Sequence, residues 1–331
     1  MALTRTHKWI IAGVAGLVLA IGLAGAGWFG WQAYRWEAPG PSLNDTVVFI
    51  EEGSSLTKAA RTLEDAGVIE DRRAFLRLVR WFGSDKPIQA GEYAMPHGVS
   101  PAEALRLLQE GVVLLRQVTV VEGMSAVQVF ERLKSEPMLE GEVAVPDEGS
   151  VLPETYSFVR GESRQAVLNR MQAAMRKTLN ELWEARDEGL PFQNPLEAVI
   201  LASIVEKETS IKREMPEVAG VYINRLRAGM RLQADPTVIY PVTQGKPLGR
   251  RIRLSELRAE NAYNTYVIVG LPAGPIANPS RQALEAVLKP AKTKNLYFVA
   301  DGSGGHRFAE TYEEHARNVK QWRRFRVENG I

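Results

Sequence analysis

The chain of 331 residues contains no cysteine and only four histidines. Without a thiol it can form no disulfide framework and carry out no thiol chemistry. The histidines show none of the sequence spacings that are typical of metal ligands. We therefore expect neither a metal site nor a cofactor.

An excess of positive charge is also missing. The chain has 41 Lys and Arg residues against 39 Asp and Glu, a net charge of +2, and the basic residues are spread along it. A nucleic-acid-binding surface needs a basic patch or stripe, so we expect no nucleic acid partner. The short basic runs at 250–253 and 323–326 are interpreted as solvated surface or ligand contacts.

Charge of either sign is absent between Lys8 and Arg35. About 20 apolar residues suffice to span a bilayer, and the apolar run at 9–31 is slightly longer, with tryptophans near both ends as in interfacial belts. Basic residues before this run predict a cytoplasmic N-terminus at 1–8 and place the rest of the chain outside the cytoplasm. A cleaved signal peptide is the alternative, because small residues stand at 24–26, but the apolar run is too long for a signal core. We expect a retained transmembrane helix at 9–31.

A linker is predicted at 32–45, followed by a small α+β module at 46–112. The module reads as a strand at 47–50, two helices, a strand at 89–95 and a third helix that is capped at Ser100 and ends near Gly111. This order resembles a LysM-like glycan-binding unit, a signal of low specificity. A weak repeat relates the segments that begin at Val48 and Val118, each a strand, a Glu-Gly turn and a capped helix.

Residues 113–331 predict a larger α+β domain. Helices are expected at 163–187, 194–210, 216–227 and 280–288 and from 312 onwards, with strands at 112–121 and 296–300. The stretch at 134–161 is expected to be a loop. So is the polar stretch at 230–237, which could also be an Asp-Pro turn followed by a strand.

The helix expected at 194–210 carries the glutamate on which the functional hypothesis depends. At 100° per residue, Glu208 falls beside Leu201 and Val205, whereas Glu206 points to another side. A carboxyl group on an apolar face loses hydration, which raises its pKa and keeps it protonated near neutral pH, ready to act as a general acid. A glutamate paired with an arginine at the helix end is the other interpretation of this helix.

Five segments carry long and specific motifs: VEKETS at 205–210, YINRLRAGMRLQADPTVIY at 222–240, AYNTY at 262–266, GLPAGPIANP at 270–279 and KTKNLYFVADGSGGHRF at 292–308. Together they resemble the YceG-like family, the membrane-anchored endolytic murein transglycosylases, over essentially the whole chain. The resemblance implies an inner-membrane anchor and a periplasmic domain that cuts peptidoglycan glycan strands. The cut between N-acetylmuramic acid and N-acetylglucosamine would leave a 1,6-anhydro end and would terminate or trim nascent strands.

By the same resemblance, the catalytic residue is the second glutamate of Val-Glu-Lys-Glu-Thr, Glu208, which the helical face also favours over Glu206. The partner class that it implies is the wall-synthesis machinery. The substrate-binding candidates are Glu148, Tyr156, Asn224, Gln233, Asp235, Tyr263 and Asn264. The sequence departs from the family pattern at Leu152, where an aromatic residue is expected, and at Glu154, where an aspartate is expected.

A lytic transglycosylase can work with one carboxyl group, whereas ordinary glycosidases use two. Two alternatives stay open from the sequence. The chain could be a hydrolase of the same glycan, with Asp235 or Glu148 as the second carboxylate, or a non-catalytic wall-binding scaffold.

The first prediction concerns topology. Because positive charge precedes the apolar run at 9–31, protease added to spheroplasts should degrade the part of the chain that follows it. Full protection of that part would contradict the assignment.

Overall fold

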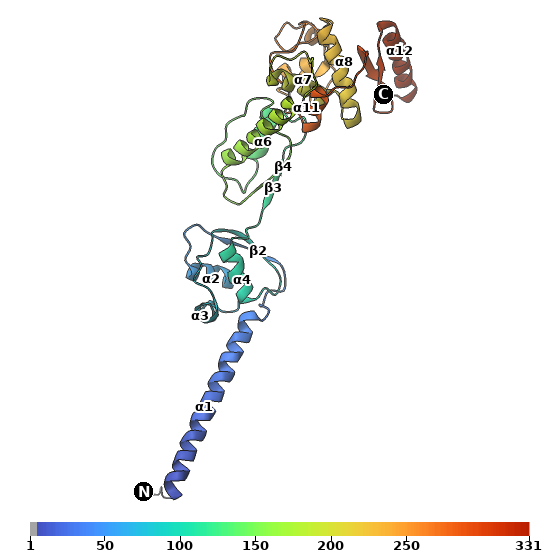
Figure 1. The fold of residues 1–331 in the computed structure, drawn as a ribbon. Coiled ribbons are helices and arrows are strands. Elements are labelled where there is room, and N and C mark those ends of the chain that lie inside the picture. Colours follow the sequence, from blue (N-terminus) through green and yellow to red (C-terminus); the bar gives the residue numbers. More distant parts are fainter. Residues whose placement is uncertain (1–4, 331) are drawn as a thin grey trace. The chain divides into compact units, whose positions relative to one another are not determined.

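The structure, a computed structural model, describes residues 5–330. The chain divides into two compact units, Met1–Arg116 and Gln117–Ile331 (Figure 1). Both units combine helices with short strands, and every sheet in the described part has two strands. This mixture agrees with the predicted α+β class.

The first unit begins with a long apolar helix and continues into a small globular module. Its elements are α1 (Arg5–Glu37), β1 (Thr46–Ile50), α2 (Leu56–Asp65), α3 (Arg72–Phe82), β2 (Gly91–Met95) and α4 (Pro101–Glu110). β1 and β2 pair antiparallel, with Thr46 opposite Met95 and Ile50 opposite Gly91. The order strand, helix, helix, strand is the one predicted for residues 46–112.

Helix α1 is long and apolar enough to cross a membrane, and none of the residues in its apolar span is buried. The helix continues past the predicted span to Glu37, so the first residues of the predicted linker at 32–45 are helical. The reason lies in packing: Trp36 is buried in the module core and contacts Phe75 with ring centroids 6.4 Å apart. Trp28 meets Trp81 of α3 edge to face at 5.3 Å, which ties the end of the apolar helix to the module.

Local capping explains the helix ends in this module. Ser55 and Ser100 accept hydrogen bonds from the backbone N–H groups of Lys58 and Glu103, which satisfies donors in the first turns of α2 and α4. Gly111 ends α4 in the left-handed conformation, with φ of 69°. The faces that these helices turn inward form one apolar core with β1 and β2.

The second unit contains most of the helices. Its elements are β3 (Arg116–Thr119), which begins one residue earlier, α5 (Ala126–Lys134), β4 (Thr155–Phe158), α6 (Arg164–Glu184), α7 (Pro195–Glu208), the short 3₁₀ helix η1 (Lys212–Glu214), α8 (Met215–Arg227), α9 (Asp235–Thr243), α10 (Leu254–Leu257), α11 (Arg281–Leu288), β5 (Tyr297–Ala300), β6 (His306–Ala309) and α12 (Tyr312–Asn329). β3 pairs with β4, and β5 pairs antiparallel with β6.

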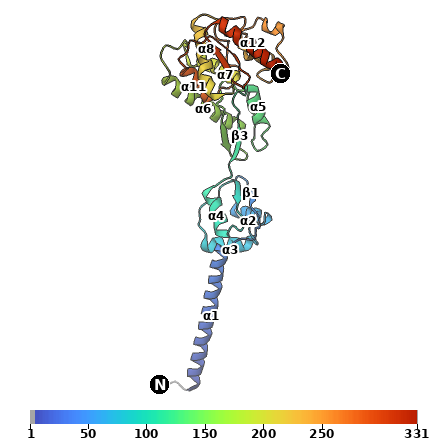
Figure 2. The ribbon, with the colours of Figure 1, turned by 90° about the vertical axis from the view of Figure 1, so that its right-hand side faces the viewer.

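Helix α7 is the centre of this unit. Every residue from Ala198 to Val205 is buried, because α6, α8, α9 and α11 pack around it (Figures 1 and 2). A helix that is apolar all round belongs in a core, as predicted for this stretch. The Asn194 side chain caps the helix by accepting from Glu197 N–H, and the Glu197 carboxylate accepts from Gln193 N–H.

Two predicted loops contain regular structure instead. The stretch at 134–161 includes β4, whose four residues are too few for a period-2 pattern to be seen in sequence. The stretch at 230–237 runs into α9, because Pro236 occupies the first turn of that helix, where a missing N–H costs nothing. The alternative of a strand after the Asp-Pro pair is therefore wrong.

The second prediction concerns the turn that carries Glu148. Gly149 has φ of 76°, and a Cβ there would lie 2.8 Å from Pro275 and 2.9 Å from a methyl group of Val199. Gly141 has nearly the same φ, 72°, and open space around it. Gly141→Ala should cost about 1–2 kcal/mol for the left-handed backbone, and Gly149→Ala about 1–3 kcal/mol more for overpacking. Urea unfolding of the full chain in detergent measures both, and equal losses would contradict the packing account.

Candidate functional site

Glu208, the last residue of α7, lines a cavity of about 380 Å³. We call this cavity the Glu208 pocket. Its walls come from α7, α8, α9, α12, strand β5 and the segments 232–235 and 266. They are formed by Glu208, Tyr222, Arg225, Leu232, Gln233, Asp235, Tyr266, Phe298, Val299 and His315.

Among residues 5–330, one direct hydrogen bond holds the Glu208 carboxyl group. The hydroxyl of Tyr222 donates to Glu208 Oε1 at 2.9 Å. Burial raises the pKa of Glu208 from its ordinary value of 4.5 to about 7; the Tyr222 hydrogen bond opposes this rise, the charge of Asp235 adds to it, and Arg225 opposes it. Near neutral pH the group therefore exists in both protonation states, which suits a residue that must give and take one proton.

Arg225 supplies the positive charge of the pocket, and backbone carbonyls fix its position. Its Nε donates to Leu296 O at 2.7 Å and its Nη1 to Leu232 O at 2.7 Å. Its guanidinium lies over the ring of Tyr297, with the Cζ atom 5.3 Å from the ring centroid. Burial lowers the pKa of Arg225. Arg225 sits three residues after Tyr222 on α8, so both side chains face the same side of that helix.

Asp235 is the second carboxylate of the pocket. It is the first residue of α9, and the hydroxyl of Tyr266 donates to its Oδ1 at 2.5 Å. Burial, followed by this bond and the charge of Asp235, raises the pKa of Tyr266, so the tyrosine stays a donor. The Asp235 side chain is thereby oriented within the cavity that contains Glu208.

Gln233 adopts a left-handed backbone conformation, with φ of 52°, which is uncommon for a residue with a side chain. A buried network holds the backbone there. Gln233 N–H donates to Thr265 O at 3.1 Å, Ala234 N–H donates to Thr265 Oγ1 at 2.9 Å, and the hydroxyls of Thr237 and Thr265 lie 2.8 Å apart. Strain of this kind is found where a site over-determines the backbone.

Of the predicted site residues, the structure brings Glu208, Gln233 and Asp235 together in the Glu208 pocket. It does not bring Asn224 or Asn264 there. The Asn224 amide donates to the carbonyls of Thr293 and Asn295, at 2.9 and 3.1 Å. The fully buried Asn264 amide donates to three carbonyls of the segment 256–259. Both amides thus donate to backbone carbonyls of loops.

Glu148, Tyr156 and Tyr263 also lie outside the walls of the pocket. Glu148 accepts from Ala126 N–H at 2.8 Å, at the start of α5, and from Tyr240 Oη at 3.1 Å. Tyr156 donates to Leu152 O at 2.7 Å. The ring of Tyr263 packs on that of Tyr240 at 5.0 Å. A role of these three residues in substrate binding stays a prediction.

Leu152, which stands where the family pattern has an aromatic residue, is a core residue. Its side chain is 3% exposed and packs in the apolar cluster around α7. Glu154 is exposed.

The sequence alone did not identify the aromatic and cationic side chains that line the Glu208 pocket. Tyr222 and Arg225 stand within one of the quoted motifs, but the sequence alone does not assign them to the site. Their signal was available in part, because Tyr222 and Arg225 are three residues apart on a predicted helix. Phe298 and His315 come from β5 and α12, far along the chain, and no local pattern places them near Glu208.

Comparison with known proteins agrees with this fold. The model of the YceG-like family matches residues 48–321. The chain belongs to the YceG-like family. A relative from Streptococcus pneumoniae D39, named endolytic murein transglycosylase, is 30% identical, and the match covers 92% of this chain and 64% of the relative. A relative from Bacillus subtilis 168 with the same name is 29% identical, and the match covers 82% of this chain and 83% of the relative. This chain therefore spans slightly less than two thirds of the pneumococcal relative.

A crystal structure of a YceG-like protein from Listeria monocytogenes is also similar, with a TM-score of 0.50 and 27% identity. The match covers 83% of this chain and 99% of the Listeria chain. The YceG-like fold therefore extends over most of the present chain.

The third prediction follows from the pKa of Glu208. Because folding raises this pKa from 4.5 to about 7, the stability contributed by the protonated group is complete below pH 4.5 and is lost as the pH rises through 7. Glu208→Gln lacks this titration. Its unfolding free energy should exceed that of the unchanged chain well above neutral pH by on the order of 3 kcal/mol, and the excess should vanish in acid. Urea unfolding across pH measures the difference, and a difference independent of pH would show that Glu208 is not desolvated.

Proposed function

We propose that this YceG-like chain is an endolytic murein transglycosylase with Glu208 as its one acid and base. The observation that carries the proposal is a carboxyl group in a cavity, with a pKa of about 7 and a fixed tyrosine donor. The names of the relatives from S. pneumoniae and B. subtilis support the same activity. Glu208 is also the residue that matches the catalytic position of the family motif.

In this mechanism Glu208 begins protonated. It donates its proton to the oxygen of the bond between N-acetylmuramic acid and N-acetylglucosamine, that bond breaks, and an oxocarbenium-like centre forms at the muramoyl C1. The 6-hydroxyl of the same sugar then attacks C1 and gives its proton to the Glu208 carboxylate. The products are a 1,6-anhydro end and a free hydroxyl, and Glu208 is protonated again.

The surroundings of Glu208 suit both halves of this cycle. Tyr222 and Arg225 stabilise the carboxylate after it has given its proton. Asp235 raises the proton affinity and, as a fixed negative charge, can stabilise positive charge at C1. Tyr266 keeps the Asp235 side chain oriented. The left-handed backbone at Gln233 presents an amide side chain to the same cavity, where acetamido groups need hydrogen-bond partners.

Hydrolysis of the same bond is the second candidate, because Asp235 lies in the cavity with Glu208. A hydrolase of the ordinary kind needs a second carboxylate, either against water or as a nucleophile. Glu148 does not line this cavity, so Asp235 is the candidate for that role. The products separate the two reactions, since an anhydro end is one water lighter than a reducing end.

We further infer a location and a role for the first unit. The apolar α1 is proposed to anchor the chain in the inner membrane, with the second unit in the periplasm beside nascent strands and the wall-synthesis machinery. The strand–helix–helix–strand order of residues 46–112 supports a LysM-like glycan-binding role.

The fourth prediction is that Glu208→Gln keeps the fold and loses the activity. The amide oxygen can still accept from Tyr222, but the group cannot give or take the proton. General acid–base help is worth about 10²- to 10⁴-fold, so cleavage of purified peptidoglycan should fall at least that far. Glu206→Gln is the matched control and should lose much less, because Glu206 serves to accept from Ser280 N–H at 2.8 Å, beside the start of α11.

Mass spectrometry of the products completes this test. The unchanged chain should yield anhydro-muramoyl ends. Reducing muramic acid as the main product would replace the transglycosylase with the hydrolase, and an active Glu208→Gln chain would contradict both.

A further inference from the structure

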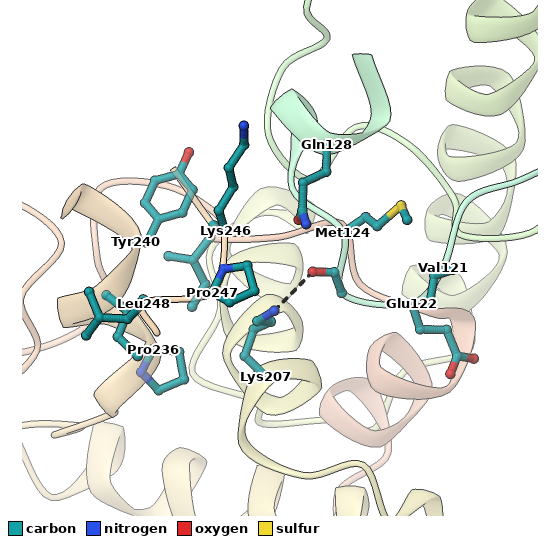
Figure 3. A pocket seen from close by; sticks show the side chains of 14 residues that line it. Val121, Glu122, Met124, Gln128, Lys207, Pro236, Tyr240, Lys246, Pro247 and Leu248 are labelled. Atoms are coloured by element: carbon teal, nitrogen blue, oxygen red, sulfur yellow. Dashed lines mark hydrogen bonds between the residues drawn. The ribbon is translucent and has the colours of Figure 1, made fainter. Parts of the chain in front are cut away.

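A second cavity, of about 480 Å³, lies within the same unit as the Glu208 pocket (Figure 3). Its walls come from the Glu-Gly turn at 122–123, the start of α5, the last turn of α7, helix α9 and the loop that follows α9. None of the assigned substrate-binding residues lines it.

The two cavities share the same stretches of chain. Lys207 lines the second cavity, and the next residue, Glu208, lines the first; Pro236 lines the second, and the preceding residue, Asp235, lines the first. Adjacent Cα atoms are about 3.8 Å apart, and consecutive side chains on a helix point about 100° apart. The two cavities therefore adjoin each other at the last turn of α7 and the first turn of α9.

The polar side chains of the second cavity are those of Glu122, Gln128, Lys207 and Lys246, and the Glu122 carboxylate is paired with Lys212 at 3.0 Å. Lys207 Nζ donates to the carbonyl of Gly123 at 3.2 Å, the bond drawn as a dashed line in Figure 3. An ammonium group has three donors, so two remain for a ligand. Lys246 also lines the cavity and forms an exposed ion pair with Glu131 at 2.6 Å. Such an exposed pair is weak, so a ligand can replace it.

The remaining walls are largely apolar. Met124, Ile239, Tyr240 and Leu248 contribute side chains, and Pro247 lies between the two lysines in Figure 3. Apolar walls with a few placed polar groups are typical of a ligand site. The ligand that fits is small, carries a carboxylate for Lys207 and has apolar side chains for the walls.

We propose that this cavity, called here the stem pocket, binds the peptide that the muramoyl sugar carries on its lactyl group. The proposal rests on the proposed function and deepens it. A murein strand bound with its scissile bond at Glu208 places a lactyl peptide on the sugar next to that bond. This peptide contains alanine methyl groups and free carboxylates, which match the walls and the ammonium group. The enzyme then acts preferentially on strands that still carry their peptides.

The fifth prediction tests this preference with the full chain in detergent. Two glycan substrates of equal length are compared, one with un-cross-linked peptides and one from which an amidase has removed them. The unchanged chain should cleave the peptide-bearing strand with the higher kcat/KM. Lys207→Met keeps the length and apolar stem of the side chain but removes its charge, and it should lower the ratio of the two kcat/KM values about tenfold. Lys177→Met, an exposed lysine on α6, is the control for loss of one charge and should leave the ratio unchanged.

Each other outcome is informative. If the unchanged chain cleaves both substrates equally, or if Lys207→Met slows both by the same factor, the cavity does not read the peptide and the proposal is wrong. The proposed function would survive either result, because anhydro ends would still form. Absence of anhydro ends from both substrates would overturn the proposed function itself.

Discussion

The desolvation of one carboxyl group is the constraint on which the second unit depends. Helix α7 is buried all round from Ala198 to Val205, so the helix cannot rotate without exposing apolar surface. Its last residue, Glu208, is therefore carried to the boundary between core and cavity. The cost of ionising a carboxyl group there is set by the elements that surround it, among them α8, α9, α12 and β5.

Opposing interactions then adjust that cost. Burial and the charge of Asp235 favour the protonated form of Glu208, while Tyr222 and Arg225 favour the carboxylate, and the resulting pKa of about 7 lies near neutral pH. Without burial the group would lose its proton well below neutral pH, and without Tyr222 and Arg225 its pKa would be higher. In the proposed mechanism one residue with such a pKa can serve both proton transfers.

Features that depend on interactions between residues close in sequence could be predicted, and features that depend on contacts between distant residues could not. Helix starts at Ser55, Ser100 and Asn194 were predictable because each cap acts within three residues. The face of Glu208 was predictable because helical geometry is local. The roles of Asn224 and Asn264 were not. An asparagine in a motif looks alike whether its amide meets a sugar or a backbone carbonyl, and the partners of Asn224 lie about 70 positions along the chain.

The motif residues that miss the pocket still determine its shape. The carbonyl and hydroxyl of Thr265 accept from Gln233 and Ala234, and its side chain meets Thr237. These bonds hold Gln233 in its left-handed conformation and so set where Asp235 enters the cavity. Two residues of the AYNTY segment therefore position Asp235 in different ways. Tyr266 donates a hydrogen bond to the Asp235 side chain, while Thr265 accepts hydrogen bonds from the backbone of Gln233 and Ala234. A substitution at Thr265 would therefore alter the electrostatics of Glu208 without touching it, since the contribution of Asp235 to the pKa of Glu208 depends on where that loop places the aspartate.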